Sequence, residues 1–444
     1  MNQATTLEQI TALCKRRGFV YQSAEIYGGL NGVYDFGPLG YLLKEAIERA
    51  WIHALQVEPG KEVLFMDGAL LGTERMWDAS GHLKNFHDPM IDCTACKHRF
   101  RADDIVREKA CPHCGSYGTW TEVREFHLMF KTAIGAAEGS QGVAYLRPET
   151  AQTIFVNFKN IISTNRVKIP FGVAQLGKAF RNEITPKQFL FRVREFEQME
   201  LEWFCRESEA EGFYHFWIAA RQRFFAALKM NPDNIRVRPY EAHELSHYSR
   251  ATSDIEYKFP FGWKELEGIA YRGDFDLKQH STYSGKELSV FDDATQQSYY
   301  PHVVECSIGV GRLFLAILCD AYREEVVEGE QRILLKLHPF LAPIKAAFLP
   351  LTKEQNSATE ALYYQVRAAT GLSLQYDASG SIGKRYRRQD EIGTPLCITY
   401  DFESAKDGCV TVRHRDTMEQ ERVAIGGLVA YIQKFIMPPS LENR

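Results

Sequence analysis

Residues 180–200 constrain the fold and chemistry of this chain more than any other segment. They read Phe-Arg-Asn-Glu, then a turn-prone loop, and from residue 191 onward Phe-Arg-Val-Arg-Glu-Phe-Glu-Gln-Met-Glu. We interpret the segment as two strands joined by a loop. Because side chains alternate along a strand, one face of the second strand is predicted to carry Arg192, Arg194, Phe196, Gln198 and Glu200.

The composition of this face indicates a ligand-binding surface. Burying arginines and carboxylates costs free energy unless they meet a polar partner. Paired guanidiniums suit phosphate oxygens, and an aromatic ring beside them offers a nucleotide base a surface for stacking. The alternative is a solvated hairpin face held by salt bridges, but the Arg-x3-Phe-x3-Glu spacing favours the ligand site.

A second motif lies at residues 305–312, which read Glu-Cys-Ser-Ile-Gly-Val-Gly-Arg and run into an apolar stretch. We expect a strand whose glycines let a ligand approach the backbone closely, followed by a helix that Arg312 opens. Taken alone, the pattern is also typical of an ordinary strand-to-helix turn.

Four of the ten cysteines form two tight pairs, Cys93-x2-Cys96 and Cys111-x2-Cys114, inside a segment with few large aliphatic residues. Two such pairs predict a structural four-thiolate zinc site, and favour it over a redox dithiol. His98 and His113 could substitute as ligands. We expect residues 90–125 to be an insertion that folds around its metal.

The composition sets the class of protein. The chain has 444 residues, of which 45% are hydrophobic and 25% charged. This is enough apolar material for a large core, and the length suggests two or three domains. A disordered chain, a collagen-like fibre and a disulfide-stapled miniprotein are excluded. The net charge of −4 gives no overall positive field, although a local basic patch remains open.

No targeting or membrane signal is visible. Residues 1–10 are polar and acidic where a signal peptide needs an apolar stretch. The apolar run at 313–318 is far shorter than the ~20 residues of a membrane span. We therefore expect a cytoplasmic protein without a membrane partner.

Apolar spacing divides the chain into a larger body and a smaller C-terminal part. In the body we expect helices at 7–17, 41–55 and 208–228, and strands at 167–176, 189–204 and 303–308. Pro339 and Pro343 bracket a linker. Beyond it, alternating strands and helices predict a compact α/β domain. We therefore expect a catalytic domain at 1–338, containing the insertion at 90–125, and an accessory domain at 339–444.

The residues at 180–200 resemble the second signature motif of class II aminoacyl-tRNA synthetases, and those at 305–312 resemble the third. Residues 32–51 fit the place of the first, dimer-forming motif, although an amphipathic helix packed on a core is the alternative. Over 27–422 the whole set is similar to the dimeric type of glycyl-tRNA synthetase. The blocks that carry this similarity are 34–40, 146–152, 180–200, 265–272, 274–277 and 381–395.

The resemblance implies an α+β fold: a class II catalytic domain built on an antiparallel sheet with flanking helices, a zinc-ribbon insertion, and a C-terminal α/β anticodon-binding domain. It also implies site residues. Those at ATP would be Arg181, Asn182, Glu183, Phe191, Arg192, Phe196, Glu265, Leu266, Arg272, Gly309, Gly311 and Arg312, of which Arg181, Glu183 and Arg312 would be catalytic. Those at the amino acid would be Arg101, Glu149, Phe196, Gln198, Glu200, Glu305 and Ser307. For Glu265 and Arg272 a surface ion pair is the alternative.

The function implied by the resemblance is ATP-dependent attachment of glycine to tRNA through a glycyl-adenylate. ATP and Mg²⁺, with Glu305 as a magnesium partner, would serve catalysis, and Zn²⁺ would be structural. The partners would be glycine, the acceptor stem and anticodon of tRNA, and a second copy of the chain. The basic run at 384–388 and the basic residues of the insertion are candidates for tRNA contact, and solvated charged surfaces are the alternative. A catalytically inactive, nucleic-acid-binding accessory protein is the other function considered.

Overall fold

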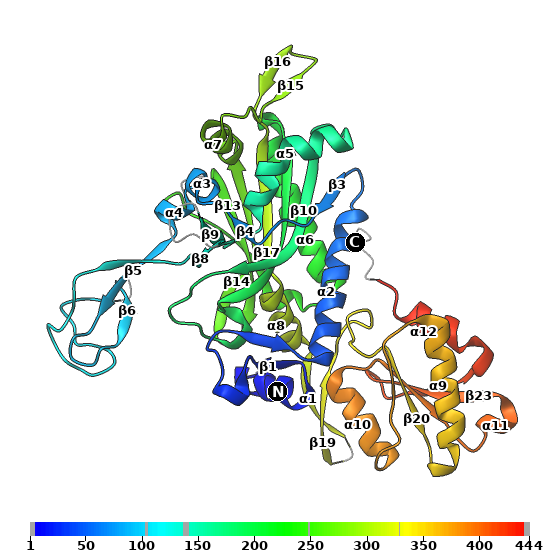
Figure 1. Cartoon of the computed structure of the whole chain (residues 1–444). Helices are drawn as coiled ribbons and strands as arrows, with labels where there is room; N and C mark the ends of the chain where they lie inside the picture. The colour runs from blue at the N-terminus through cyan, green and yellow to red at the C-terminus, as the bar shows by residue number, and fades with distance from the viewer. Residues whose placement is uncertain (1–4, 103–104, 136–141, 247–248, 328, 439–444) are drawn as a thin grey trace.

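The structure is a computed structural model that describes residues 5–102, 105–135, 142–246, 249–327 and 329–438. A seven-stranded sheet forms its centre, in the order β12-β13-β14-β17-β11-β10-β3 (Figure 1). Every neighbouring pair is antiparallel except β10 and β3, which are parallel. The strands are β3 (Val63–Met66), β10 (Phe171–Phe180), β11 (Glu195–Cys205), β12 (Ile235–Pro239), β13 (Ala251–Phe259), β14 (Gly262–Gly273) and β17 (His302–Gly309).

Helices cover both faces of this sheet, so the expected α+β class is confirmed. Helices α6 (Glu207–Ala227) and α8 (Val310–Ala321) pack on one face, in the main core. Helices α5 (Ala151–Asn165) and α7 (Phe275–Ser284) pack on the other. A short hairpin, β15 (Val290–Asp292) with β16 (Gln297–Tyr299), extends beyond α7 (Figure 1).

The alternation along β11 places the site. Met199, Leu201 and Trp203 point into the main core, whereas Phe204 points into the core under α5. Since side chains two apart share a face, Glu200 lies on the face of Phe204. Following that face toward the start of the strand, the side chains change from apolar to acidic, amide and aromatic. The sheet therefore presents a polar region where α5 begins, since Thr150 at the N-terminus of that helix donates to Glu200.

The N-terminal helices match the expected segments. Helix α1 (Leu7–Arg17) begins at a capping box in which Thr6 accepts from the Gln9 backbone N–H and Gln9 accepts from that of Thr6. Helix α2 (Pro38–Gln56) begins earlier than expected, because proline is favoured at the first helical position. Strands β1 (Val20–Gln22) and β2 (Tyr34–Phe36) pair between them, and η1 (Glu25–Tyr27) lies in their connection.

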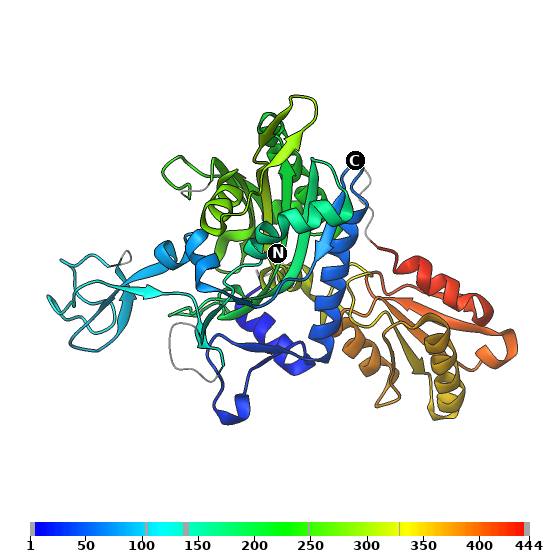
Figure 2. The same ribbon diagram turned by 45° about the horizontal axis from the view of Figure 1, so that its top comes forward.

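The segment of the chain between β3 and α5 forms an arm that projects from the body (Figure 2). Helices α3 (Glu74–Ala79) and α4 (His82–Asn85) lead into it. Its outer sheet pairs β6 (Arg99–Arg101), β5 (His87–Asp92) and β7 (Arg124–His127). At its base a second sheet pairs β4 (Leu71–Gly72), β9 (Val143–Leu146) and β8 (Lys131–Ala133).

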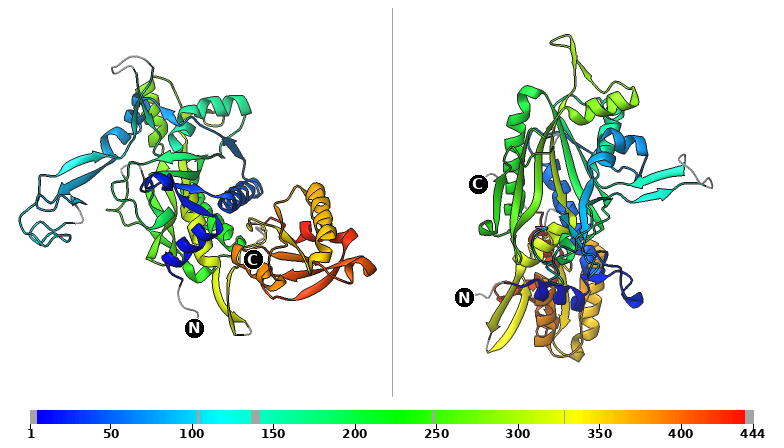
Figure 3. Two further views of the ribbon diagram at one scale, coloured as in Figure 1. Left: turned by 60° about the horizontal axis from the view of Figure 1, so that its bottom comes forward. Right: turned by 90° about the vertical axis from the view of Figure 1, so that its left-hand side faces the viewer.

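A hairpin of β18 (Tyr322–Val327) and β19 (Glu330–Leu335) leads to a separate five-stranded sheet, ordered β21-β20-β22-β23-β24 (Figure 3). Strands β20 (Ala346–Pro350), β21 (Leu374–Tyr376) and β22 (Leu396–Tyr400) are parallel, and β23 (Cys409–His414) and β24 (Gln420–Ala424) are antiparallel. Helices α9 (Asn356–Thr370) and α12 (Leu428–Phe435) cover one face, and α10 (Ile382–Ile392) covers the other.

Short elements complete the fold: η5 (Pro232–Asn234), η6 (Lys353–Gln355), α11 (Ser404–Asp407) and η7 (Ile425–Gly427). Within the described ranges, no helix is long and apolar enough to cross a membrane.

One expected strand is shorter than predicted. The sequence favoured strand structure over 189–204, but β11 begins at Glu195 and the 3-10 helix η4 (Phe189–Phe191) precedes it. Gln188 and Phe189 both have positive φ angles, which no strand accommodates. The two-residue alternation therefore holds from Phe196 onward and not before it.

Candidate active site

A cavity of about 300 Å³ opens on the polar end of the central sheet. Residues from β11, β14 and β17, from the N-terminus of α8 and from the loop before β11 surround it. It is lined by Arg181, Glu183, Leu190, Phe191, Arg192, Val193, Phe196, Gln198, Glu265, Ser307, Gly309, Gly311 and Arg312. Most of the expected nucleotide residues therefore face one space.

Arg181 and Phe196 lie against each other at this cavity. The Arg181 guanidinium carbon is 5.3 Å from the centre of the Phe196 ring and 5.3 Å from that of Phe86. Its Nε donates to the Pro148 carbonyl at 3.1 Å. Within the described parts of the chain its NH1 and NH2 groups make no hydrogen bond. The guanidinium is thus oriented by its neighbours while its forked donors stay available for an anion.

Arg312 is held on the other side of the cavity by Glu265 and Phe191. Its NH1 lies 2.9 Å from Glu265 Oε2, and its guanidinium carbon lies 4.5 Å from the Phe191 ring centre. This positive charge is the main reason that the pKa of Glu265 is lowered. Gly311 lies close to the Leu190 backbone: a Cβ there would lie 3.2 Å from the Leu190 carbonyl oxygen. Any side chain would crowd the wall of the cavity.

The two other arginines expected at the ligand-binding face, Arg192 and Arg194, point in different directions. Arg192 lines the cavity and donates through Nε to Glu183 Oε2 at 2.7 Å. Arg194 turns away and donates to the carbonyl oxygens of Glu183 and Asn31, at 2.9 and 2.6 Å. The prediction that Arg194 shares a ligand-binding face with Phe196 is therefore wrong, because the backbone before Glu195 is not a strand.

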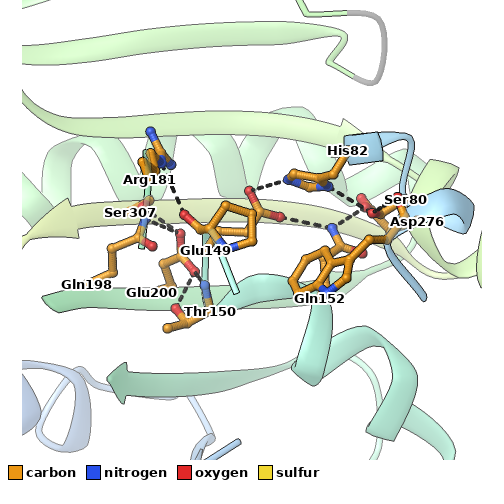
Figure 4. Close-up of polar contacts among 12 residues, drawn as sticks. Ser80, His82, Glu149, Thr150, Gln152, Arg181, Gln198, Glu200, Asp276 and Ser307 are labelled. Carbon is orange, nitrogen blue, oxygen red and sulfur yellow. Dashed lines mark hydrogen bonds and ion pairs between the residues drawn. The ribbon is translucent and has the colours of Figure 1, made fainter. Parts of the chain in front are cut away.

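A buried acidic cluster adjoins the cavity, centred on Glu200 (Figure 4). Its Oε1 accepts from Gln198 Nε2 at 2.9 Å and from the Ser307 hydroxyl at 2.8 Å. Its Oε2 accepts from both the backbone N–H and the hydroxyl of Thr150. Strand register brings this about, since Glu200 and Ser307 are paired across β11 and β17. Gln198 and Ser307 also line the cavity and form its border with the cluster.

Glu149 and Glu305 complete the cluster. Glu149 Oε2 lies 3.2 Å from His82 Nε2, and its Oε1 accepts from Gln152 Nε2 at 3.0 Å. Glu305 Oε2 accepts from Arg272 NH1 at 2.7 Å. Arg272 is itself buried and makes two further bonds to the Asp276 carboxylate, at 2.8 and 2.9 Å. Arg272 therefore lies with the acidic residues and is not a surface residue.

These carboxyl groups perturb one another. Burial, and then the Glu149 charge, raise the pKa of Glu200. Burial raises the pKa of Glu305 to about 7, with the nearby Glu200 and Glu149 adding to the effect and Arg272 opposing it. Burial also acts to raise the pKa of Glu149, but His82, Arg272 and Gln152 outweigh it and hold that pKa below its usual range. The cluster is poised to receive a positive charge.

Three expected site residues lie elsewhere. Leu266 is completely buried in the main core. Asn182 donates through its backbone N–H to the Leu128 carbonyl at 2.7 Å, at the base of the arm. Arg101 lies on β6 of the arm, 3.0 Å from Asp88 Oδ1. Neither Leu266, Asn182 nor Arg101 is among the described residues that line the cavity.

Sequence reasoning missed several residues that support the cluster. Gln152 and Asp276 fall inside blocks that carried the family resemblance, and a donor–acceptor pair joins them at 3.1 Å. His82 had no such signal, because it is a single histidine in a short helix far along the chain from Glu149.

The four paired cysteines converge in the arm. Their sulfur atoms all lie within 4.8 Å of one another, with 3.7 Å between Cys93 and Cys114 and 3.9 Å between Cys96 and Cys111. Each pair closes a backbone knuckle, and Gly115 takes the positive φ that the second knuckle requires. His98 stacks on the His113 ring, with centroids 4.3 Å apart. The geometry suits a metal ion held by four thiolates.

Comparison with known proteins agrees with this geometry. The family described as "tRNA synthetase class II core domain (G, H, P, S and T)" matches residues 137–322, and "Anticodon binding domain" matches residues 345–435. Glycine--tRNA ligases of Geobacillus thermodenitrificans and Geobacillus kaustophilus are each 50% identical to the chain; the matches cover 98% of this chain and 98% and 99% of theirs. That of Caldanaerobacter subterraneus is 48% identical, over 97% of this chain and 98% of its own. The chain therefore belongs to the glycine--tRNA ligase family of class II aminoacyl-tRNA synthetases.

Proposed function

We propose that this protein attaches glycine to tRNA in two steps, forming glycyl-adenylate from glycine and ATP and then transferring the glycyl group to the tRNA 3′ end. The observation that carries the proposal is the shared border of the two spaces. Gln198 and Ser307 line the cavity and also hydrogen-bond Glu200 in the acidic cluster. An amino acid held by the cluster would therefore lie beside a nucleotide held in the cavity.

In the first step the glycine carboxylate attacks the α-phosphate of ATP, the bond to the β-phosphate breaks, and pyrophosphate leaves. We assign to Phe196 the stacking of adenine and to Arg181, wedged against that ring, the α-phosphate. Arg312, on the far wall, would meet the pyrophosphate end. Glu183 would serve the adenine edge while fixing Arg192. These residues act by positioning and by charge stabilisation, and no covalent enzyme intermediate is needed.

Glycine has no side chain to grip, so its ammonium must be recognised. Glu149, Glu200 and Glu305 supply buried negative charge, and Ser307 and Gln198 orient Glu200. Arg272 donates to Glu305 and is itself held by Asp276, so this pair restricts the movement of the Glu305 carboxylate. Side chains packed this tightly leave little room at the α-carbon, which would exclude larger amino acids sterically. Arg101 lies on β6 of the arm. We therefore propose that it contacts the tRNA and not glycine.

Class II synthetases use ATP with Mg²⁺. We place the magnesium near Glu265, because its carboxylate lines the cavity beside Arg312 and oxygen ligands suit this ion. When bound, the ion would offset the negative charge of the polyphosphate. The sequence-based choice of Glu305 fits less well, since Glu305 is not among the described residues that line the cavity.

We propose that the four-cysteine cluster binds a structural Zn²⁺. A tetrahedral ion with Zn–S bonds near 2.3 Å requires sulfur atoms roughly 3.8 Å apart, and two pairs lie at 3.7 and 3.9 Å. Neither stacked histidine belongs to the group of potential ligands among the described residues.

Removing this metal is expected to unfold the outer arm. Purified protein should contain close to one zinc per chain by mass spectrometry of the elements, and a strong chelator should release it and raise hydrogen exchange in β5, β6 and β7. Cys96→Ser should do the same, whereas Cys409→Ser, remote from the cluster, should retain full zinc. Protein that carries no zinc when purified without chelators would contradict the assignment.

We propose a catalytic domain at 1–338 with the zinc-ribbon insertion at 90–125, and an anticodon-binding domain at 339–444. A separate apolar core formed by residues between Ala346 and Ile432 supports this division. In the second domain Arg385 is buried and donates to the Pro350 and Gly380 carbonyls, so it serves the fold. Lys384, Arg387 and Arg388 remain candidates for the anticodon, and the basic residues of the arm for the acceptor stem.

We further propose that the protein is a homodimer of the dimeric type and works in the cytoplasm. Large apolar side chains gather in the segment before and within α2, where Ile26 and Tyr27 are 87% and 86% exposed and Leu30 and Tyr41 more than half exposed. A surface of this kind is typical of a protein interface. A cytoplasmic location fits cysteines kept reduced for metal binding.

The experiment that tests the function is amino-acid-dependent exchange of pyrophosphate into ATP, measured for all twenty amino acids. Glycine should support exchange, and alanine and serine should support far less. Purified tRNA should then accept glycine. Exchange with a different amino acid would overturn the substrate. Binding of tRNA without any exchange would instead support the inactive accessory protein, against which the intact Arg181, Glu200 and Arg312 argue.

Glycine activation should weaken in mild acid. The ionised form of Glu305 attracts the ammonium, and the pKa of this group is raised to about 7. Below that pH the carboxyl becomes protonated and neutral. We expect kcat/KM for glycine to fall about tenfold per pH unit below pH 7, while kcat/KM for ATP changes less. Glu305→Gln should be weak at every pH and lose this dependence; an unchanged profile would contradict the role of Glu305.

A further inference from the structure

His82 lies beside the acidic cluster although it comes from the base of the arm (Figure 4). It is the first residue of α4, and only 13% of its side chain is exposed. Its Nε2 lies 3.2 Å from Glu149 Oε2, and its Nδ1 lies 2.8 Å from the Ser80 hydroxyl. That hydroxyl oxygen also lies 3.1 Å from the Trp77 carbonyl oxygen. The side chains of Ser80, His82 and Glu149 thus form a continuous series of hydrogen bonds.

The donors and acceptors in this series of hydrogen bonds fix the direction of the bond between His82 and Glu149. The Ser80 hydroxyl has a single hydrogen, directed either to Trp77 or to His82 Nδ1, so the ring is either doubly protonated or neutral. In both cases Nε2 carries a hydrogen, because its partner is a carboxylate that only accepts. His82 therefore donates to Glu149 in either proton arrangement.

The surroundings hold both the ring and the carboxylate in place. The His82 ring packs between those of Trp77 and Phe86, with centroids at 5.3 and 5.6 Å. On the other side of the carboxylate, Gln152 donates to Glu149 Oε1, and its own amide oxygen lies 2.7 Å from His280 Nε2. Each carboxylate oxygen is fixed by one donor and keeps a lone pair for a further cation.

We propose that His82 is a positioning residue for glycine: by donating to Glu149 from the base of the arm, it holds that carboxylate in the orientation that receives the substrate ammonium. This rests on the proposed function. His82 would not touch glycine or ATP. It would set the affinity for glycine and leave the chemical step largely alone.

The test compares His82→Ala with His82→Gln in glycine-dependent pyrophosphate exchange. Losing a hydrogen bond to a charged group should raise the KM for glycine about 10- to 100-fold, with the KM for ATP and kcat nearly unchanged. Glutamine carries a neutral amide donor at the place of Nε2 and should restore most of the affinity. His87→Ala, at the start of β5 and outside the cluster, is the matched control and should behave as wild type.

Three results would overturn the inference: a glycine KM unchanged in His82→Ala, equal losses for glycine and ATP, or a folded His82→Gln no better than the alanine variant. If His82→Ala is recovered unfolded, Ser80→Ala carries the test, since loss of the Nδ1 partner should raise the glycine KM several-fold and an unchanged value overturns the inference. Wild-type protein without glycine-dependent exchange would instead overturn the proposed function, so the two failures are distinguishable.

Discussion

Arg181→Ala should abolish glycine-dependent pyrophosphate exchange, lowering kcat/KM by about a thousandfold or more. The guanidinium is fixed by the Pro148 carbonyl and by the rings of Phe86 and Phe196, and Arg181 lines the cavity. A preorganised cation of this kind stabilises charge that develops on the α-phosphate only as the bond to pyrophosphate breaks. Its loss should therefore lower kcat as well as weaken ATP binding.

Two further variants sharpen this result. Arg181→Lys keeps the charge but loses the planar fork and the ring contacts, so it should recover only part of the activity. Lys178→Ala removes an exposed cation at the end of β10, just before Arg181, that pairs with Glu195, and should leave exchange intact. Circular dichroism and thermal unfolding should show all three folded. Exchange by Arg181→Ala within about tenfold of wild type would remove the assigned role.

Local patterns in the sequence predicted the regular elements because those elements are determined locally or by burial. Helix α1 carries its own capping signal in Thr6 and Gln9, and it ends at Gly18, whose positive φ suits a helix terminus. The alternation of β11 was correct from Phe196 onward because the apolar side chains must enter the main core.

The loop before β11 could not be predicted because distant residues shape it. Gly32 lies so close to Pro186 that a Cβ on the glycine would be 2.5 Å from the proline side chain, and the Gly32 carbonyl accepts from the Arg194 backbone N–H at 2.8 Å. Gly311 closes on Leu190 from the other side. These contacts turn Arg194 outward and bring Val193 and Leu190 to the cavity, which no local pattern signals.

The site residues that belong to family motifs could be predicted from the sequence. Residues chosen only because they lie in a run of charge were predicted less well. The basic run at 384–388 suggests an exposed tRNA surface, but helical spacing places Arg385 on the same buried face as Gln389. The sequence pattern does not show that Arg385 is buried, because it does not reveal which carbonyl groups accept hydrogen bonds from its guanidinium.

The same helix holds the chain's two halves together through Asp390, which is completely buried. Arg332 of β19 donates to its Oδ2 at 2.8 Å, and Arg413 of β23 donates to its two oxygens at 2.9 and 3.2 Å. Both arginines are themselves nearly inaccessible to solvent. One carboxylate thus accepts hydrogen bonds from two buried guanidiniums that come from opposite sides of the linker, and Arg332 also pairs with Glu325 Oε2 at 2.9 Å.

Asp390→Ala should therefore destabilise the protein by about 3–5 kcal/mol, because it leaves the buried Arg413 without its carboxylate and Arg332 with Glu325 alone. Glu403→Ala, which breaks an exposed pair with Lys406 in the same domain, should cost no more than about 1 kcal/mol. Urea unfolding followed by circular dichroism measures both. Since β19 belongs to the catalytic side, Asp390→Ala should also loosen the C-terminal domain and lower tRNA charging at temperatures where glycine-dependent exchange persists. A midpoint shift no larger than that of Glu403→Ala would show that Asp390 does not hold the two halves together, because removing a carboxylate shared by two buried arginines must cost more than breaking an exposed pair.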